Sequence, residues 1–196
     1  MANTALNVSV GKPKAGGAIY TAPLDSTLPS SANGELDAAF KCLGFVSEDG
    51  LVNSNSPESD QVKAWGGDTV LTLQTDKSDT FQFTLLEVLN EDVLKAVYGA
   101  SKVSGTLATG ITVRANSEEV AACVWVFDMI MTGGTLKRIV VPNAKISELG
   151  DITYKDKEAV GYQVTIEAMP GNEAFGYDTH KEYITQASQG ATGSTG

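Results

Sequence analysis

Apolar and polar residues alternate with a period of two over long parts of this 196-residue chain, and this pattern constrains the fold more than any other feature. The alternation runs through residues 69–75, 80–86 and 161–168. It is typical of β-strands that have one face in a core and the other in water. The residues predicted to face the core are Leu71, Leu73, Phe81, Phe83, Leu85, Tyr162, Val164 and Ile166.

Turn signals lie between these and further strands. Residues 49–50 (Asp-Gly) separate two strand-like segments and indicate a tight hairpin. Residues 133–134 (Gly-Gly) indicate a second hairpin after residues 120–131. That segment is apolar on both faces apart from Asp128, so we expect a central strand or one side of an interface. The pattern of residues 111–114 predicts another short strand.

Helix is predicted mainly over residues 90–98. Asn90 suits the N-cap, acidic residues occupy the first turn, and Gly99 suits the end of the helix. Residues 35–40 form a weaker helix candidate. The apolar stripe of the main helix, predicted to pack on the core, consists of Val93, Leu94 and Val97.

One internal segment, residues 53–68, fits neither pattern because it is long, polar and rich in turn-forming residues. Loops of more than about 12–15 residues inside a compact domain are usually functional or unstructured. We therefore predict a functional loop at 53–68 within a single domain that spans residues 18–184. An N-terminal arm (1–17) and a flexible C-terminal tail (185–196) are expected to flank that domain.

Charge and hydropathy exclude several classes of partner. The chain has 24 acidic and 14 basic residues and a net charge of −10. Surfaces that grip nucleic acid or anionic lipid need clustered lysine and arginine, so neither type is expected. No apolar stretch approaches the roughly 18 residues of a membrane span, and residues 1–17 lack the apolar core of a secretory signal. We expect a soluble, acidic protein that does not bind membranes.

Histidine and cysteine offer little catalytic or metal-binding chemistry. His180, the single histidine, could belong to a nucleophilic triad, but its polar surroundings and the lack of a Gly-x-Ser-x-Gly elbow favour a surface histidine. Cys42 and Cys123 lie far apart in apolar contexts, which favours buried free thiols over a redox or metal site.

Glycine pairs and carboxylates are equally uninformative about chemistry. The glycine pairs match no phosphate-binding motif, so turns are the expected use. Glu118, Glu119 and Asp128 could pair for acid–base chemistry, but solvated charges are the more common arrangement. No catalytic, cofactor-binding or metal-ligating residue is predicted, and the chain is not expected to be an enzyme.

Residues 36–99 resemble the major tail protein, or tail tube protein, of bacteriophages with long, flexible, non-contractile tails, in the variants that infect Gram-positive hosts. The resemblance covers about a third of the chain. It lies in the segments FKCLGFVSEDGL (40–51), KAWGGD (63–68), DTFQFTL (79–85) and VYG (97–99), in this order and at compact spacing.

This resemblance implies an antiparallel β-sandwich of two sheets with one short flanking α-helix. It also implies hexameric rings that stack into a hollow tube for genome delivery, with one sheet of each subunit closing a β-barrel around the lumen. A long loop between two strands reaches the adjacent ring, and the termini act as arms between subunits. Residues 53–68 are the candidate loop, and the residues expected to make the inter-ring contact are Asn53, Ser56, Glu58, Asp60, Val62, Lys63 and Trp65.

The partners implied by the resemblance are other copies of the chain, a tape measure protein in the lumen, a tail terminator and baseplate or tail-tip proteins. DNA passes transiently through the lumen without specific binding, and no cofactor is implied. The expected location is the virion tail, after synthesis in the host cytoplasm. Physically, an acidic chain suits a conduit for DNA, because a basic lumen would hold phosphates and stall their passage.

Two other assignments remain open from the sequence. One is the tube protein of a contractile or secretion-type injection machine. The other is a stand-alone β-sandwich binding module, although the exposed aromatic cluster typical of such modules is not evident, since Trp65 and Trp125 lie far apart. Trp65 itself could anchor an interface or instead fold back to cap its own subunit.

Overall fold

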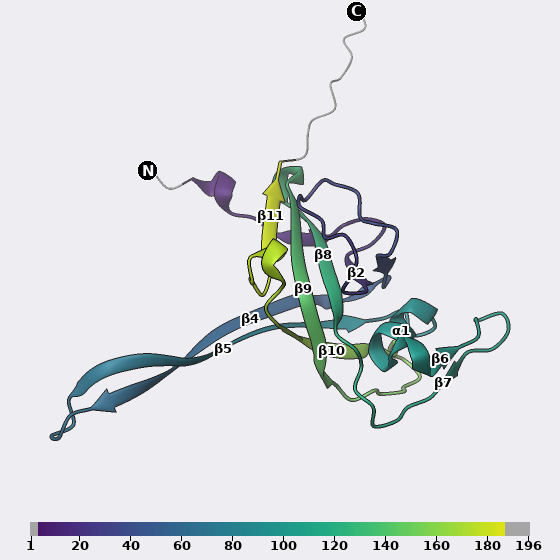
Figure 1. Ribbon diagram of the computed structural model, residues 1–196. Helices are drawn as coiled ribbons and strands as arrows, with labels where there is room; N and C mark the ends of the chain where they lie inside the picture. The colour runs from purple at the N-terminus through teal and green to yellow at the C-terminus, as the bar shows by residue number, and fades with distance from the viewer. Residues whose placement is uncertain (1–3, 187–196) are drawn as a thin grey trace, which may run out of the picture.

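The computed structural model describes residues 4–186 and is mainly β, antiparallel and equipped with one α-helix in that range, as predicted (Figure 1). Among the described residues, no helix is long and apolar enough to cross a membrane. The strands are β1 (Gly11–Pro13), β2 (Ile19–Ala22), β3 (Lys41–Cys42), β4 (Val46–Lys63), β5 (Thr69–Leu85), β6 (Val103–Ser104), β7 (Thr112–Val113), β8 (Cys123–Met131), β9 (Leu136–Leu149), β10 (Tyr162–Ala168) and β11 (Lys181–Thr185). The helix is α1 (Glu91–Tyr98), and short 3-10 turns occupy Ala5–Asn7, Ala100–Lys102, Thr132–Gly134 and Glu173–Phe175.

Nine of the strands form one sheet, in which seven follow the order β3-β2-β8-β9-β10-β5-β4 and β1 and β11 pair off this path, while β6 and β7 pair separately. β8 lies in the interior of this order, as predicted for a segment that is apolar on both faces. β1, which lies within the predicted N-terminal arm, pairs with the end of β8, and β11 pairs with β9. Residues 1–3 and 187–196 of the predicted arm and tail lie outside the described residues.

The sheet bends so that its two halves face each other as layers. Neighbouring strands lie about 4.8 Å apart, so a flat sheet would place β5 roughly 14 Å from β8, three positions away. Instead, the ring centroids of Phe81 and Phe127 are 5.3 Å apart, and those of Phe83 and Trp125 are 5.5 Å apart. In Figure 1 the β4–β5 ribbon crosses β8 and β9 at a steep angle. The core therefore lies between two halves of one continuous sheet.

Helix α1 follows the sequence prediction closely. The Asn90 side chain accepts a hydrogen bond from the Asp92 backbone N–H at 3.0 Å, and Gly99 ends the helix. Its buried residues dock it on the core, and they include the predicted Val93, Leu94 and Val97.

The second predicted helix, at residues 35–40, is wrong. These residues contain a turn, in which the Asp37 side chain accepts from the Ala39 N–H at 2.9 Å and the Asp37 carbonyl accepts from the Phe40 N–H at 3.0 Å. An aspartate that binds nearby backbone groups in this way competes with helix formation. Propensity over six residues is too weak to outweigh that local turn.

The predicted hairpin at residues 49–50 is also wrong, whereas the one at 133–134 is confirmed between β8 and β9. β4 runs through residues 49–50, and its pairing with β5 shifts between Val46 and Leu51. Gly50 has a φ of 74° there. An irregularity of this kind and a hairpin both favour glycine at positive φ, so the local sequence does not distinguish them.

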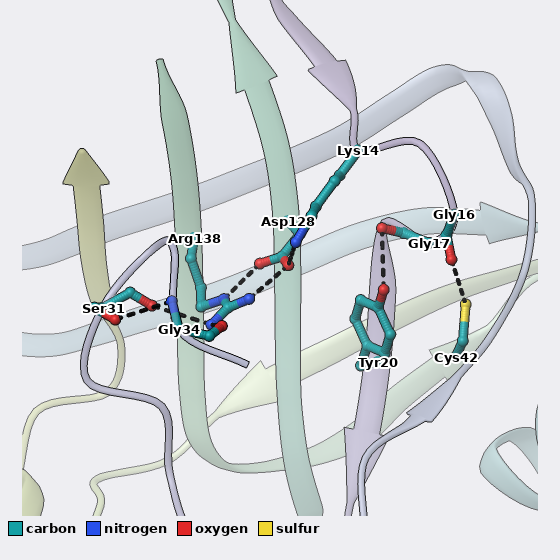
Figure 2. A network of polar contacts seen from close by, with 9 residues as sticks. All are labelled: Lys14, Gly16, Gly17, Tyr20, Ser31, Gly34, Cys42, Asp128 and Arg138. Carbon is teal, nitrogen blue, oxygen red and sulfur yellow. Dashed lines mark hydrogen bonds and ion pairs between the residues drawn. The ribbon is translucent and has the colours of Figure 1, made fainter. Parts of the chain in front are cut away.

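A buried ion pair joins β8 to β9 (Figure 2). Arg138 Nε donates to Asp128 Oδ1 at 2.6 Å, and its Nη2 donates to Oδ2 at 2.8 Å. Arg138 Nη1 also donates to the carbonyls of Ser31 and Gly34, at 3.0 and 2.8 Å. The expectation that Asp128 is a solvated charge is therefore wrong, because both side chains are almost fully buried. Its position directly opposite Arg138 in the sheet is what a single strand pattern cannot reveal.

Candidate functional site

The β4–β5 hairpin extends far beyond the body of the subunit (Figure 1). Its inner part belongs to the core, since β5 carries the buried Phe81, Phe83 and Leu85. All residues from 52 to 77 are exposed. The hairpin closes at residues 64–68, which we call the tip, where Ala64 N–H donates to the Asp68 carbonyl at 2.8 Å.

The predicted loop at residues 53–68 is therefore wrong in its secondary structure. Residues 53–63 belong to β4 and pair with β5, with register shifts after Glu58 and Val62, and a turn is confined to the tip. Asparagine, serine and proline have low strand propensity, which is why the segment looked like a loop. The cross-strand hydrogen bonds to β5 outweigh that preference, and Pro57 is compatible with β4 because β4 is an edge strand.

One face of the outer hairpin carries three apolar side chains near its end. Val62 lies directly opposite Leu71, and Leu73 follows two residues after Leu71 on the same face. The three side chains, which we call the apolar face, are 45–49 % exposed. The prediction that Leu71 and Leu73 belong to the subunit's own core is therefore wrong. Their alternation is genuine, but β5 carries them beyond the opposing layer that could bury them.

The predicted contact residues lie along this hairpin from its inner end to its tip. By strand alternation Ser56, Glu58 and Asp60 share the side of Val62, and the irregularity after Glu58 brings Leu71 and Leu73 to that side. Trp65 lies in the tip and is fully exposed, so it does not cap its own subunit. Lys63 ends β4 beside the tip, whereas Asn53 lies at the inner end and is engaged there.

A buried carboxylate fixes the inner end of the hairpin. Asp79, on β5, is 1 % exposed and accepts hydrogen bonds from Asn53 Nδ2 at 2.9 Å and Thr179 Oγ1 at 2.6 Å. His180 Nδ1 lies 2.6 Å from Asp79 Oδ2. These four residues, which we call the root cluster, join both hairpin strands to the segment that precedes β11.

The root cluster controls the ionisation of Asp79. Burial by itself would raise the pKa of the Asp79 carboxyl. The hydrogen bonds from Thr179, Asn53 and His180 outweigh burial, so the pKa of Asp79 lies below its ordinary value. The ionised form therefore stabilises the fold, and this stabilisation is complete above the ordinary carboxyl pKa and disappears as the pH falls through the lower folded-state value.

Replacing Asp79 with alanine is expected to lower the free energy of unfolding at pH 7 by about 1–3 kcal/mol, because the hydrogen bonds of three side chains to a buried carboxylate are lost. Urea denaturation from pH 7 down to pH 2 should show a smaller acid-induced loss of stability in Asp79→Ala than in the unchanged protein. Asp60→Asn, at an exposed carboxyl on the same hairpin, is the control. It should change neither the free energy of unfolding at pH 7 nor the acid-induced loss of stability. An equal acid-induced loss in Asp79→Ala and the unchanged protein would contradict this role.

The other candidate groups lie in structural settings. His180 contacts Asp79 and packs edge-on against the Phe81 ring, with centroids 5.3 Å apart, so it is engaged at the root cluster and is not a plain surface histidine. Cys42 and Cys123 are both free and only partly buried. No group of three histidine, cysteine, aspartate or glutamate side chains among residues 4–186 could hold a metal ion.

Sequence reasoning thus located Trp65 and Val62 at an exposed site but missed two of the three residues of the apolar face. A signal for them was present. The polar run at residues 76–79 (Asp-Lys-Ser-Asp) interrupts the apolar alternation of 69–85 and separates the exposed half of β5 from its buried half.

Comparison with known protein families gives a match over most of the chain. A family model described as "Phage tail tube protein" matches residues 5–187, which is nearly the whole chain. Among curated proteins, no significant match was found.

Proposed function

The chain belongs to the phage tail tube protein family, and on this premise we propose that its subunits form rings that stack into a hollow conduit for delivery of the genome. Members of the family are structural proteins of the virion tail, where they assemble into a tube with other tail proteins. Six subunits per ring are expected from the resemblance carried by residues 36–99. The chain acts as a structural element without catalysis.

The observation that carries the stacking proposal is the hairpin that projects from the subunit with an uncovered apolar face. A two-stranded hairpin alone in water is marginally stable at best. The apolar face and the fully exposed Trp65 add exposed apolar side chains to the outer hairpin, and exposed apolar surface marks contacts between proteins. β4 also leaves one side of its backbone without a partner strand along the described sheet, which a neighbouring subunit can cover. The hairpin thus has the properties of a connector between rings.

The acidic composition supports passage of DNA without retention. With a net charge of −10, an assembled tube carries many negative charges for each ring. Negative walls repel phosphates, whereas clustered lysine and arginine bind them by releasing counterions. The tape measure protein, tail terminator and tail-tip proteins are the expected neighbours of such a tube, by the resemblance alone.

Shortening the hairpin tests the stacking role. Asn55 and Asp79 lie directly opposite each other, so residues 56–78 can be replaced by an Asn-Gly turn without losing the root cluster. The shortened subunit is expected to remain folded, with a far-ultraviolet circular dichroism spectrum typical of β-sheet, but to form no tubes in negative-stain electron microscopy.

Two neighbouring single substitutions provide a matched comparison. Leu73→Ser removes part of the apolar face and should abolish or shorten the tubes, whereas Thr72→Ser, on the opposite side of the same strand, should leave them unchanged. Normal tubes from the shortened subunit would show that the hairpin is not the connector. Equal effects of the two single substitutions would show that the apolar face is not what is recognised.

A further inference from the structure

A groove lies between the N-terminal segment 13–18 and the residues that lead into β4, and we call it the arm groove. Its main cavity has a volume of about 480 Å³. A second cavity of about 230 Å³ continues it and shares Pro13, Ala18 and Val46 with the first. Phe45, 75 % exposed, lines the main cavity. Most of the residues that line the main cavity are apolar or glycine. An aromatic group in the cavity can therefore contact apolar side chains and, at the glycines, the backbone.

Polar contacts fix the walls of the arm groove (Figure 2). Lys14 Nζ lies 3.3 Å from Asp128 Oδ2, and Cys42 Sγ lies 3.9 Å from the Gly16 carbonyl oxygen. On the opposite wall, the Phe45 N–H donates to Glu87 Oε1 at 3.1 Å. The groove is therefore formed before any partner arrives, which lowers the entropic cost of binding.

We propose that the arm groove of one subunit receives the hairpin tip of a second copy, with Trp65 in the main cavity. This inference rests on the proposed stacking function and names the acceptor surface for the hairpin. Val46, at the groove, begins β4, and Lys63, beside the tip, ends it. At about 3.3 Å per residue, donor and acceptor are separated by roughly 56 Å along the ribbon. Two different patches at opposite ends make a heterologous contact, which extends an assembly along one direction when its rotation does not close a ring.

Size and polarity match between tip and groove. Pockets that enclose small organic groups measure about 300–1,000 Å³, so a cavity of about 480 Å³ has ample room for an indole ring. Trp65 is fully exposed on its own subunit and gains the most from entering apolar surroundings. The ring of Phe45 offers it an aromatic neighbour in the cavity.

Charge is mixed at the arm groove. Before Asp25 the sequence has no acidic residue, and its two lysines in that stretch, Lys12 and Lys14, line the arm groove. The exposed part of the hairpin, residues 52–77, carries four carboxylates against two lysines. The groove also has carboxylates in its walls, namely Glu48, Glu87 and Asp128, and Asp128 pairs with Lys14. Charge is therefore nearly balanced at the groove, and the match with the tip lies in size and polarity.

The native Cys42, which lines the main cavity, allows a direct test. Cysteine is introduced at the tip in separate variants, Lys63→Cys, Ala64→Cys and Asp68→Cys, each of which retains Trp65. A disulfide forms only when the two Cα atoms approach within about 7 Å. Tubes of these variants, treated with diamide, should give a ladder of covalent oligomers on non-reducing gels for at least one tip position. The ladder should disappear with Cys42→Ser and persist with Cys123→Ser.

The possible outcomes separate this inference from the proposed function. If tubes require the hairpin but no tip variant links to Cys42, the arm groove is not the acceptor. A ladder that persists with Cys42→Ser overturns the assignment as well. If the shortened hairpin still forms tubes, the stacking role itself fails.

A second variant, Phe45→Glu, replaces an exposed apolar side chain of the groove wall with a carboxylate. It should reduce the yield of tubes at least tenfold while leaving the subunit folded. An undiminished yield would count against the groove as the acceptor.

Discussion

Replacing Phe83 with alanine is expected to lower the free energy of unfolding of the unassembled subunit by about 3–5 kcal/mol, since a large buried ring is lost and a cavity remains. Phe83 is 2 % exposed, and its ring lies 5.5 Å from the rings of both Trp125 and Phe127. These contacts join the two layers of the bent sheet, so neither layer can move in to fill the space without losing its own strand pairing.

Leu73→Ala is the matched control on the same strand. Leu73 has the same alternation in sequence but is 49 % exposed on the outer hairpin. Its truncation should cost less than about 1 kcal/mol, because little area is removed from water on folding of the single subunit. Urea denaturation followed by circular dichroism measures the free energy of unfolding of both variants. Similar losses for the two variants would mean that the core does not end where the structure places its boundary.

This contrast shows what alternation can and cannot predict. A period of two identifies a strand with two different faces, and it correctly indicated β10 and the inner half of β5. It does not say what covers the apolar face. For Phe83 the cover is β8 of the same chain, whereas for Leu73 no part of the described chain supplies one. Burial of that kind depends on where a distant layer ends, which local sequence does not encode.

The candidate site was predictable to a similar extent. Trp65 in a polar segment indicated an exposed anchor, and the structure places it at the tip. The form of the segment was not predictable, because strand pairing with β5 outweighs the turn preference of its serines and asparagines. The arm groove could not be predicted at all. Its walls come from residues 13–18 and 42–46, which only the tertiary fold brings together.

The buried ion pair between Asp128 and Arg138 leads to the second large effect on stability. Burying two charges costs several kilocalories per mole, which their attraction and additional hydrogen bonds must offset. Arg138 is 1 % exposed, and its guanidinium donates hydrogen bonds to Asp128 and to the carbonyls of Ser31 and Gly34. Those carbonyls cannot neutralise a guanidinium. Asp128 also accepts a hydrogen bond from Lys14. Replacing Asp128 therefore also removes a contact that holds one wall of the arm groove.

Asp128→Ala is therefore expected to lower the free energy of unfolding by about 3–5 kcal/mol, as when one partner of a buried pair is removed and the other charge stays. Glu182→Ala, which breaks the partly exposed pair with Lys137 at 2.8 Å, is the control and should cost at most about 1 kcal/mol. Combining Asp128→Leu with Arg138→Met removes both charges and should recover much of the loss, but not all of it, because the Ser31 and Gly34 carbonyls lose their donor. Urea denaturation at pH 7 ranks the four proteins. If the double variant is no more stable than Asp128→Ala, the cost comes from lost packing, and the uncompensated guanidinium is not its cause.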